Sequence, residues 1–385
     1  MKTRIICLSI CIVTTLLTQE VSGWAQNEKG VMIRRVFQKY TQEEGVRNAF
    51  FRMESSKQQI PIEFVYGKFK SGDSVTANTP FYTASIGKTF TATAIGLLVD
   101  EGGLSFDDFA IDHLGDLVKG LSMINGVDYS DKLTIHHLLS HTSGLPDYFE
   151  DQPVKGVNMM QKLLMEPNRF WEPQALIDFT KGAFQAHFKP GDGYHYTDTE
   201  YVLLGLIIEK VSGMRLYDFF QERIFKPFSL SLTSMNLRSE PIKKPDFPMA
   251  EIYAGPMEIS TYRSLSADWA GGAIRSSGKD LNSFLKALVS GEVVSEANLE
   301  KMKQWTFESQ GTYYGYGLRK WALKELSSDF PEFSLVGHSG STGAFMYYCP
   351  ELDVYLSGTF NNTDFLQKHI LFLTEVLTVI SQETK

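Results

Sequence analysis

Cysteine is scarce in this chain. Its 385 residues hold three cysteines, and two of them, Cys7 and Cys11, fall within the first 25 residues. Only Cys349 is left for the rest of the chain, so an intramolecular disulfide is excluded there. The apolar, β-rich sequence around Cys349 predicts a buried small side chain rather than a nucleophile.

Long hydrophobic runs are also missing. The apolar run at residues 5–17 is too short to span a bilayer. It follows Lys2 and Arg4 and precedes small residues, which is the pattern of a secretory signal peptide cut near Gly23 or Ala25. An uncleaved anchor is the alternative. We therefore expect an exported chain, periplasmic or extracellular, with no integral membrane span once the signal peptide is removed.

Positive charge is in deficit. The chain has 37 Lys and Arg against 45 Asp and Glu, a net charge of −8. The first 25 residues carry two cations and one acid, so the remainder holds 35 cations and 44 acids, a net charge near −9. This argues against nucleic acid and anionic membranes as partners and leaves a small-molecule or peptide substrate open. It says nothing about oligomeric state.

What is present is strand-like sequence at both ends and helical sequence between them. Period-2 and β-rich runs predict a hairpin at residues 49–66 and strands at residues 334–337, 344–349 and 354–360. Helical spacing of apolar residues or a buried apolar run predicts helices at residues 86–99, 134–140, 173–180, 201–211, 215–225, 281–289 and 365–380.

This order predicts an α/β lobe built from both ends of the chain and an inserted, mainly helical lobe. The signal peptide would take residues 1–25. The α/β lobe would be discontinuous, with residues 26–90 and 266–385, and the helical lobe would take residues 91–265. A cleft between two lobes is a common place for an active site.

Ser85 and Lys88 form the pattern S-x-x-K at the start of the predicted helix 86–99. Residues three apart lie on one face of a helix. The N–H of Ser85, as a helix-end donor, could bind an oxyanion formed at its acyl group. Lys88, buried behind an apolar helix, could lose its charge and help to take the Ser85 proton.

The pattern S-x-x-K occurs twice more, at Ser276 with Lys279 and at Ser283 with Lys286. A single match is weak, because surface helices produce it often. Only the Ser85 copy follows a short strand-like run and opens a long apolar helix, and this context favours Ser85 as the nucleophile.

Two further segments carry candidate chemistry. Tyr196 precedes Asp198 in a loop after a Pro-Gly turn, and a Tyr beside a cation can act as an acid or base. His338 begins the run His-Ser-Gly-Ser between two predicted strands. If this run ends an edge strand, a substrate backbone can lie beside it, with the Ser341 N–H as second oxyanion donor. A packed Tyr ring and a plain hairpin with a surface His are the structural alternatives.

These three elements, in this order, resemble the penicillin-recognising serine hydrolases: class C β-lactamases, D-Ala-D-Ala carboxypeptidases, D-aminopeptidases and related esterases, with S-x-x-K, Y-x-N and K-T-G or H-x-G. Longer blocks are similar too, among them FYTASIGKTFTATAIGLLVDEGG, TIHHLLSHTSGLPDY, PGDGYHYTDTEYVLLG, WAGGAIRSSGKDL and GHSGSTGAF. The resemblance covers residues 48–361. It implies a β-lactamase/transpeptidase-like fold, an antiparallel sheet flanked by helices with an inserted helical lobe.

By position, the resemblance implies that Ser85 is the nucleophile and that Lys88 and Tyr196 share proton transfer. It assigns substrate and oxyanion binding to the positions of Asp198, His338, Gly340 and Ser341, and it implies no cofactor or metal.

Two positions depart from the family pattern. Asp198 places an anion where an amide usually stands, and it could pair with Lys88, hold it protonated and shift the base role toward Tyr196. A neutral His338 would attract a substrate carboxylate less than the lysine that many members have. Both departures argue against an efficient β-lactamase or carboxypeptidase and leave esterase or aminopeptidase activity more open.

Three histidines invite a zinc hypothesis. His137 and His141 are spaced i, i+4 beside His136, but no Glu follows His137 and no third ligand is evident. We expect His136 and His137 in a packed short helix and His141 in the turn that ends it.

The leading hypothesis is therefore an exported serine hydrolase that forms an acyl-enzyme on Ser85 and hydrolyses an ester or an amide, peptide-like or β-lactam-like. The alternative is a catalytically weak, penicillin-recognising binding or sensor protein on the same fold, which Asp198 would favour. A third is a structural protein in which the motifs are idle.

Overall fold

The computed structural model describes residues 28–55 and 58–382 of the chain. The expected signal peptide lies outside these residues. Within the described ranges, no helix is both long enough and apolar enough to cross a membrane.

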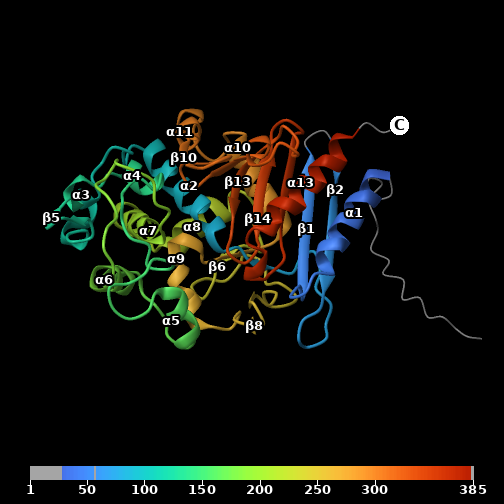
Figure 1. Ribbon diagram of the computed structural model, residues 1–385, viewed down its shortest axis with the longest axis horizontal. Coiled ribbons are helices and arrows are strands. Elements are labelled where there is room, and N and C mark those ends of the chain that lie inside the picture. Colours follow the sequence, from blue (N-terminus) through green and yellow to red (C-terminus); the bar gives the residue numbers. More distant parts are fainter. Residues whose placement is uncertain (1–27, 56–57, 383–385) are drawn as a thin grey trace, which may run out of the picture.

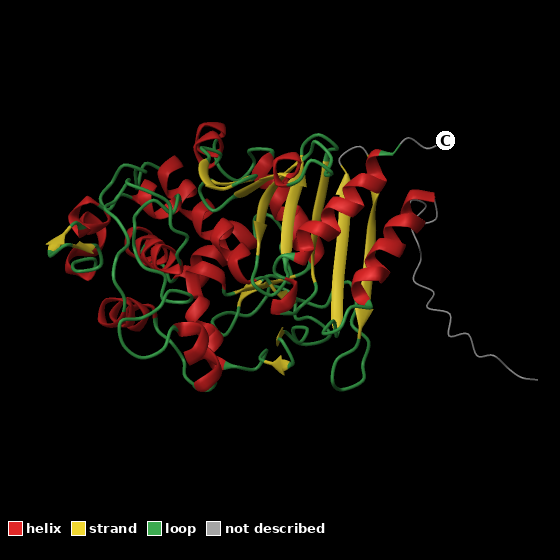
Figure 2. Cartoon of the chain, in the orientation of Figure 1, coloured by secondary structure: helices red, strands yellow, loops and turns green. Residues whose placement is uncertain are grey.

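The centre of the α/β part is one antiparallel sheet of eight strands (Figures 1 and 2). In spatial order its strands are β10 (Thr306–Ser309), β11 (Thr312–Tyr314), β12 (Arg319–Ala322), β13 (Ser334–Ser339), β14 (Phe345–Cys349), β15 (Val354–Thr359), β1 (Asn48–Ser55) and β2 (Gln58–Gly67). Strands β1 and β2 form the expected hairpin, and β1 pairs with β15, so both ends of the chain contribute to the sheet. The predicted fold class is confirmed.

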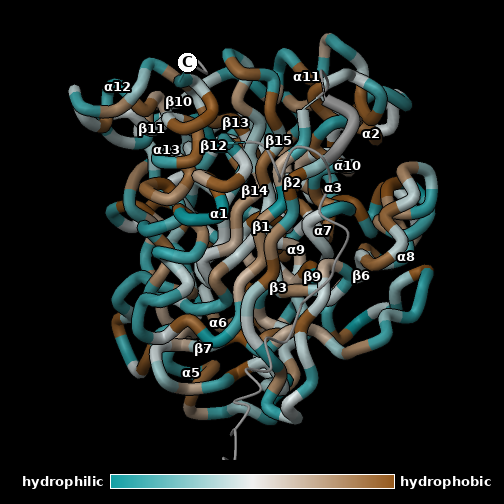
Figure 3. The backbone as a smooth tube through the Cα atoms, turned by 90° about the vertical axis from the view of Figure 1, so that its right-hand side faces the viewer, coloured by the Kyte–Doolittle hydropathy of each residue, from teal (hydrophilic) through white to brown (hydrophobic). Residues whose placement is uncertain are grey.

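Helices cover both faces of this sheet because its strands are apolar on both sides. Phe51 packs in one hydrophobic cluster with α1 (Glu28–Thr41) and α13 (Lys368–Ser381), while its neighbour Phe50 packs in the other cluster, which includes α10 (Gly278–Val289). Figure 3 shows brown, hydrophobic stretches along the central strands and teal along much of the periphery.

Most of the remaining helices come, in sequence, after strand β2 and before strand β10. Figure 2 shows this helical part to one side of the sheet. They are α2 (Gly87–Asp100), α3 (Ala110–Leu114), α4 (Ile135–Leu139), α5 (Met159–Met165), α6 (Pro173–Ala183), α7 (Asp198–Ser212), α8 (Leu216–Phe220), α9 (Trp269–Gly272), α11 (Glu296–Met302) and α12 (Leu323–Leu326). The lobe boundaries expected at residues 90 and 265 stay a prediction.

Short strands support the loops of the helical part. They are β3 (Phe81–Tyr82), β9 (Ile274–Ser276) and β6 (Ser234–Met235), which form one small sheet, and the pairs β4 (Met123–Ile124) with β5 (Val127–Asp128) and β7 (Tyr253–Ala254) with β8 (Met257–Glu258).

Helix α2 is the central element of the core. Nearly all its side chains are buried, and its polar ones find internal partners: Thr89 Oγ1 donates to Gly317 O at 2.7 Å, and Thr91 Oγ1 donates to Ala270 O at 2.6 Å. Because these hydroxyls are satisfied, the helix can be surrounded by protein. It therefore holds its N-terminal turn in a fixed place.

One expectation about the sheet was wrong. Strand β13 is not an edge strand, because it pairs with β12 on one side and β14 on the other. Its pairing with β12 ends at Gly337, which faces Arg319, while its pairing with β14 continues to Ser339. The free edge that a substrate could use is therefore only the last part of the strand.

Candidate active site

Ser85 lies in a strained turn that joins β3 to α2. The short 3-10 helix Ala84–Ile86 holds it, and Ala84 has a φ of 47°, in the left-handed region that L-residues rarely adopt. The turn is anchored because the Thr83 N–H and its Oγ1 both donate to Ile274 O on β9, each at 2.9 Å. Ser85 is thereby presented at a cavity, ahead of the helix.

Lys88 is fully buried and donates in three directions. Its Nζ lies 2.5 Å from Asp198 Oδ1, 3.1 Å from Gly271 O and 3.4 Å from Ser85 Oγ. Burial alone would lower the pKa of Lys88, but the charge of Asp198, with Tyr196, outweighs burial and raises that pKa above its usual value. The hypothesis that Lys88 loses its charge is wrong; the ammonium form persists, as expected if Asp198 pairs with it.

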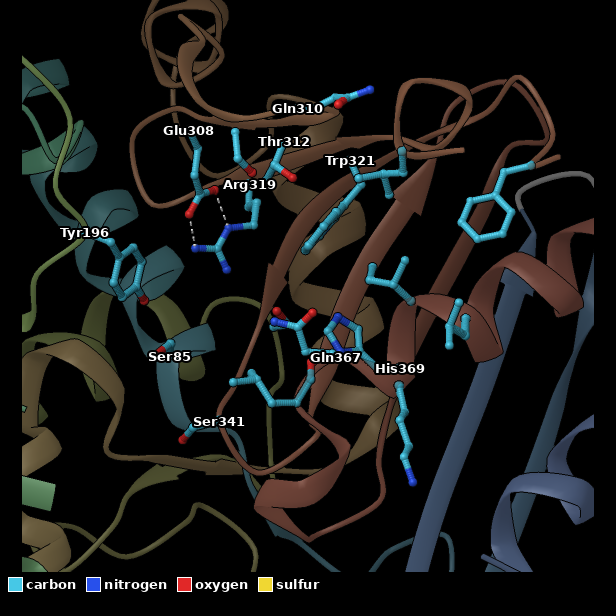
Figure 4. A pocket seen from close by; sticks show the side chains of 18 of the residues that line it. Ser85, Tyr196, Glu308, Gln310, Thr312, Arg319, Trp321, Ser341, Gln367 and His369 are labelled. Atoms are coloured by element: carbon cyan, nitrogen blue, oxygen red, sulfur yellow. Dashed lines mark hydrogen bonds and ion pairs between the residues drawn. The ribbon is translucent and has the colours of Figure 1, made fainter. Parts of the chain in front are cut away.

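Tyr196 lies against this ammonium group just before α7. Thr197 caps that helix, its side chain accepting from the Thr199 N–H at 3.0 Å, and the Lys88 Nζ is 4.8 Å from the centre of the Tyr196 ring. Burial raises the pKa of the phenol, while the Lys88 charge and a hydrogen bond with Ser85 only partly oppose this. At neutral pH Tyr196 is therefore a protonated phenol beside Ser85 (Figure 4).

Asp198 is the first residue of α7, where a negative charge suits the helix dipole. Its N–H donates to Asp147 Oδ1 at 2.9 Å, so a second carboxyl lies nearby. A Cβ on Gly271 would come 2.2 Å from Asp198 Oδ1, so only glycine allows the carboxylate this position beside Lys88. Sequence reasoning did not find Asp147 or Gly271, because neither stands in one of the three motifs.

Asp268 is a third carboxyl in this cluster and was also missed. Its Oδ2 accepts from the Tyr82 hydroxyl at 2.6 Å. Burial and the nearby charge of Asp198 raise the pKa of Asp268 to about 6, and the same two causes raise the pKa of Asp147. One buried ammonium thus faces several acids, and the proton count of the site depends on pH.

The raised pKa of Asp268 predicts that the stability of the fold depends on pH. The variant Asp268→Asn should show a weaker dependence. A carboxyl with a raised pKa keeps its proton in the folded state after the unfolded chain has lost it, so folding is weakened as pH rises from about 4 through 6. Melting temperatures measured from pH 4.5 to 8 should show that the variant gains stability relative to the natural chain as pH rises. The exposed Asp112→Asn variant should show no such trend, and parallel curves for all three proteins would contradict the prediction.

The end of β13 approaches the nucleophile turn closely. A Cβ on Gly340 would lie 2.2 Å from Thr83 O and 2.8 Å from Ala84 Cβ. The Gly340 N–H donates to Ala344 O at 2.8 Å, so it is not a substrate donor in this structure. The contribution of Gly340 is close packing, which brings Ser341 to the same cavities as Ser85.

Gly340→Ala should therefore disturb both the fold and the site. The clash is with backbone, which cannot move away cheaply, so we expect a loss of about 1–3 kcal/mol of unfolding free energy and a reduced kcat. Urea unfolding and turnover of any accepted substrate would measure this. Gly182→Ala is the matched control, because Gly182 lies in helix α6 and a Cβ added there would meet nothing within 4 Å. Equal losses of unfolding free energy and kcat in the two variants would refute the packing argument.

His338 lies behind the site rather than in it. It is fully buried and does not line either of the two cavities at Ser85. Its Nδ1 donates to Ser339 O at 2.7 Å, which leaves Nε2 to accept from the Tyr314 hydroxyl at 3.0 Å. Burial and the charges of Arg319 and Lys88 lower the pKa of His338 well below its usual value. It is a neutral supporting residue here, without contact to the cleft.

Two cavities meet at Ser85. The larger, of about 680 Å³, is lined mainly by polar residues, and the smaller, of about 80 Å³, is lined mainly by apolar side chains. Both share Ser85, Glu150, Tyr196 and Ser341. Ser85 is therefore accessible from both cavities.

Arg319 is a functional candidate that no sequence motif indicates. It lies on β12 in the larger cavity, and its guanidinium forms two 2.8 Å bonds with Glu308 of β10 (Figure 4). It also stacks over the Tyr196 ring at 5.1 Å. Arg319 is thus a cation that lines the larger cavity, as Lys368 also does, whereas His338, the position that the family pattern suggested, lines neither cavity.

The other sequence candidates have internal partners. His136 Nδ1 lies 2.6 Å from the Tyr316 hydroxyl, His137 forms a capping box with Thr134, and His141 is hydrogen-bonded to Glu200 inside the core. The three histidines therefore bond to three different residues. Cys349 is buried as expected, and burial raises its pKa to about 12.

A comparison with protein families settles the relationship. The family model described as Beta-lactamase matches residues 34–371. The chain belongs to the β-lactamase family. The resemblance expected from the motifs is confirmed, and as a β-lactamase-family chain it has serine hydrolases as relatives.

Among relatives of this β-lactamase-family chain is a penicillin-binding protein of Bacillus subtilis, 29% identical over 340 residues that cover 80% of this chain and 68% of the relative. Solved structures include a D-stereospecific amidohydrolase from Streptomyces (24% identity, TM-score 0.74, covering 93% of this chain and 100% of that one). Another is a D-amino acid amidase from Ochrobactrum anthropi complexed with D-phenylalanine (22%, TM-score 0.75, 93% and 100%). At these identities the two structures show the fold alone.

Proposed function

We propose that this protein is an exported serine hydrolase that is acylated on Ser85 and hydrolyses esters or amides of small or peptide substrates. The observation that carries the proposal is the convergence of Ser85, the Lys88–Asp198 pair and Tyr196 where two cavities meet. Export rests on the N-terminal sequence, with Lys2 and Arg4 before a short apolar run.

The proton arrangement supports Asp198 as the acceptor of the Ser85 proton. When Ser85 Oγ bonds to the carbonyl carbon, its proton passes to the Lys88 Nζ while Nζ gives one of its protons to Asp198. Lys88 stays an ammonium group and Asp198 becomes a carboxylic acid. The carbonyl electrons form an oxyanion, which the N–H groups of Ser85 and Ser341 would bind.

The second half of acylation uses Tyr196. As the bond to the leaving group breaks, the phenol gives its proton to the departing nitrogen or oxygen. The phenolate lies against the cations of Lys88 and Arg319, which stabilise it until Asp198 returns a proton through Lys88. Water then attacks the acyl carbon and gives a proton to Tyr196, whose own proton passes through Lys88 to Asp198. As the bond between Ser85 Oγ and the acyl carbon breaks, Asp198 returns this proton to Ser85 through Lys88 and the acid product leaves.

The two cavities suggest the substrate class. Apolar residues of the smaller cavity suit an apolar acyl side chain; they include Phe149, Met160, Leu163, Ile252 and Leu265. The larger cavity, with Arg319, suits a polar or carboxylate-bearing leaving group. Because structural neighbours are named for D-stereospecific hydrolysis, we propose D-aminoacyl amides and short D-peptides as the first candidates, with simple esters beside them.

A substrate screen of the purified chain tests this proposal. The panel is D- and L-phenylalanine amide, a p-nitrophenyl ester, a D-Ala-D-Ala peptide and penicillin, followed by turnover and by intact mass. We expect turnover of the D-amide or the ester and poor turnover of penicillin. A stable penicillin adduct without turnover of any substrate would favour the sensor function. The absence of both an adduct and turnover would refute the hydrolase.

Arg319→Gln should separate binding of charged and neutral leaving groups. Loss of the cation should raise KM about 10- to 100-fold for a substrate with a free carboxylate and much less for its amidated form. Glu308→Gln frees Arg319 from its anionic partner and should lower the KM of the carboxylate substrate. If both variants shift the two substrates equally, Arg319 does not bind the carboxylate.

A further inference from the structure

Three side chains outside the cleft converge on one point. His187 Nε2 lies 2.7 Å from Asp151 Oδ2, and His195 Nε2 lies 3.1 Å from the same oxygen. The two imidazole rings are 3.8 Å apart between centres. All three ligand atoms lie within 4.8 Å of one another, and this is the one such group of His, Cys, Asp or Glu in the part of the chain that the structure describes.

The Asp151 oxygen at the centre has too many neighbours for hydrogen bonding alone. Besides the two imidazole nitrogens, Oδ2 accepts from the Asp147 N–H at 2.8 Å. A carboxylate oxygen offers about two lone-pair positions, so three N–H donors exceed its capacity. If the imidazoles turn lone pairs rather than protons toward this point, a cation between the three atoms removes the conflict.

The spacing also suits a metal ion. Zinc bonds to His nitrogen and to carboxylate oxygen at about 2.0–2.2 Å, which for tetrahedral angles puts neighbouring ligand atoms roughly 3.3 Å apart. The observed separation from Asp151 Oδ2 is 3.1 Å for His195, close to that value, and 2.7 Å for His187, about 0.6 Å shorter, so an ion would move the His187 ring slightly outward. Two imidazoles and one carboxylate are a donor set that zinc and similar ions accept.

The site is both held and accessible. The main-chain N–H of His187 donates to Gly144 O at 2.8 Å and that of His195 donates to His141 O at 2.9 Å, so the backbone holds both residues beside the segment 141–144, which shortly precedes Asp151. The side chains are 40% exposed at His187, 26% at His195 and 18% at Asp151, which leaves an entry path and room for water as a fourth ligand.

We propose that Asp151, His187 and His195 form a binding site for one divalent transition-metal ion, with Zn²⁺ as the best match. None of the three residues lines the two cavities at Ser85, so the ion takes no part in the acylation chemistry. Its role is structural: it ties the loop before Tyr196 to the turn after Asp147, whose carboxylate accepts from the Asp198 N–H. The ion thus stabilises the segment that positions Tyr196.

The test uses the whole purified chain after removal of metals by a chelator. Calorimetric titration with Zn²⁺ should give one site per chain, and Co²⁺ should give visible absorption bands of a low-coordinate nitrogen and oxygen site. Zn²⁺ should raise the melting temperature. His187→Ala should weaken binding at least about 100-fold and abolish both the Co²⁺ bands and the thermal shift.

Two further variants make the result decisive. Asp151→Asn keeps an acceptor for the Asp147 N–H but is a poor metal ligand, and it should behave like His187→Ala. His113→Ala removes the histidine of another surface His–Asp pair, His113 with Asp108 at 3.3 Å, and should bind as the natural chain does. Absence of a Zn²⁺ shift and Co²⁺ bands in the natural chain, or their survival in folded Asp151→Asn protein, would overturn the proposal whatever the substrate screen gives.

Discussion

Replacing Ser85 by alanine is expected to abolish hydrolysis and all covalent labelling by a fluorophosphonate. The nucleophile accepts the acyl group directly, and in serine hydrolases its removal lowers kcat by up to about 10⁶. We expect at least a 10⁴-fold loss of kcat/KM here, measured with the best substrate of the screen. Stability should change little, because Ser85 is only partly buried at the mouth of two cavities.

The chain supplies its own control for this experiment. Ser283 stands in another S-x-x-K pattern, with Lys286 in helix α10, and is partly exposed. Ser283→Ala should keep full labelling and full turnover. Labelling that persists in Ser85→Ala, or that disappears in Ser283→Ala, would show that the nucleophile has been assigned to the wrong serine.

Replacing Lys88 by methionine should damage stability as well as activity. Its ammonium group is buried and balances Asp198, with Asp147 and Asp268 close to that carboxylate. Removing one partner of a buried ion pair leaves an uncompensated charge and costs about 3–5 kcal/mol. Urea unfolding at pH 8 would measure this loss, and kcat should fall on the order of 10²- to 10⁴-fold because the proton path is cut.

The loss in Lys88→Met should depend on pH in a defined direction. Burial already raises the pKa of Asp147 and of Asp268, and the Lys88 charge opposes this, so without that charge these carboxyls bind a proton still more readily in the folded than in the unfolded state. A group of this kind weakens folding as pH rises through and above its unfolded value near 4. The variant should therefore be closer to the natural chain at pH 5 than at pH 8.

A second substitution distinguishes charge imbalance from lost packing. In Lys88→Met/Asp198→Asn the unpaired carboxylate is gone, so most of the lost unfolding free energy should return. Lys286→Met, at an exposed position of the same S-x-x-K spacing, should stay within about 0.5 kcal/mol of the natural chain. No recovery in the double variant would mean that the ion pair is not what stabilises this part of the core.

Elements with strong local signals were predictable from the sequence. The hairpin of β1 and β2, helix α2 after Ser85 and helix α13 follow from apolar periodicity and turn residues, and the structure places them within a few residues of the expected ranges. Helix α7 begins earlier than predicted, at Asp198, because Thr197 caps it and its first turn is polar.

What sequence reasoning missed depends on contacts between distant segments. Arg319 has no motif around it, and its place in the cleft follows only from the pairing of β12 with β13. Asp268 joins the Lys88 cluster through the approach of α9 to the nucleophile turn, which no local pattern encodes. The expected edge position of β13 failed for the same reason, since strand order is a property of the whole sheet.

The pairing of β1 with β15 has a consequence for how the chain is made. Phe50 lies opposite Thr359, so the strands that meet there are about 300 residues apart in the sequence. At about 5–20 residues per second, a ribosome needs on the order of 15–60 s to synthesise the missing partner. During this time the edge of β1 that faces β15 in the finished sheet has no partner strand. The eight-stranded sheet can form only after the C-terminal strands have been synthesised.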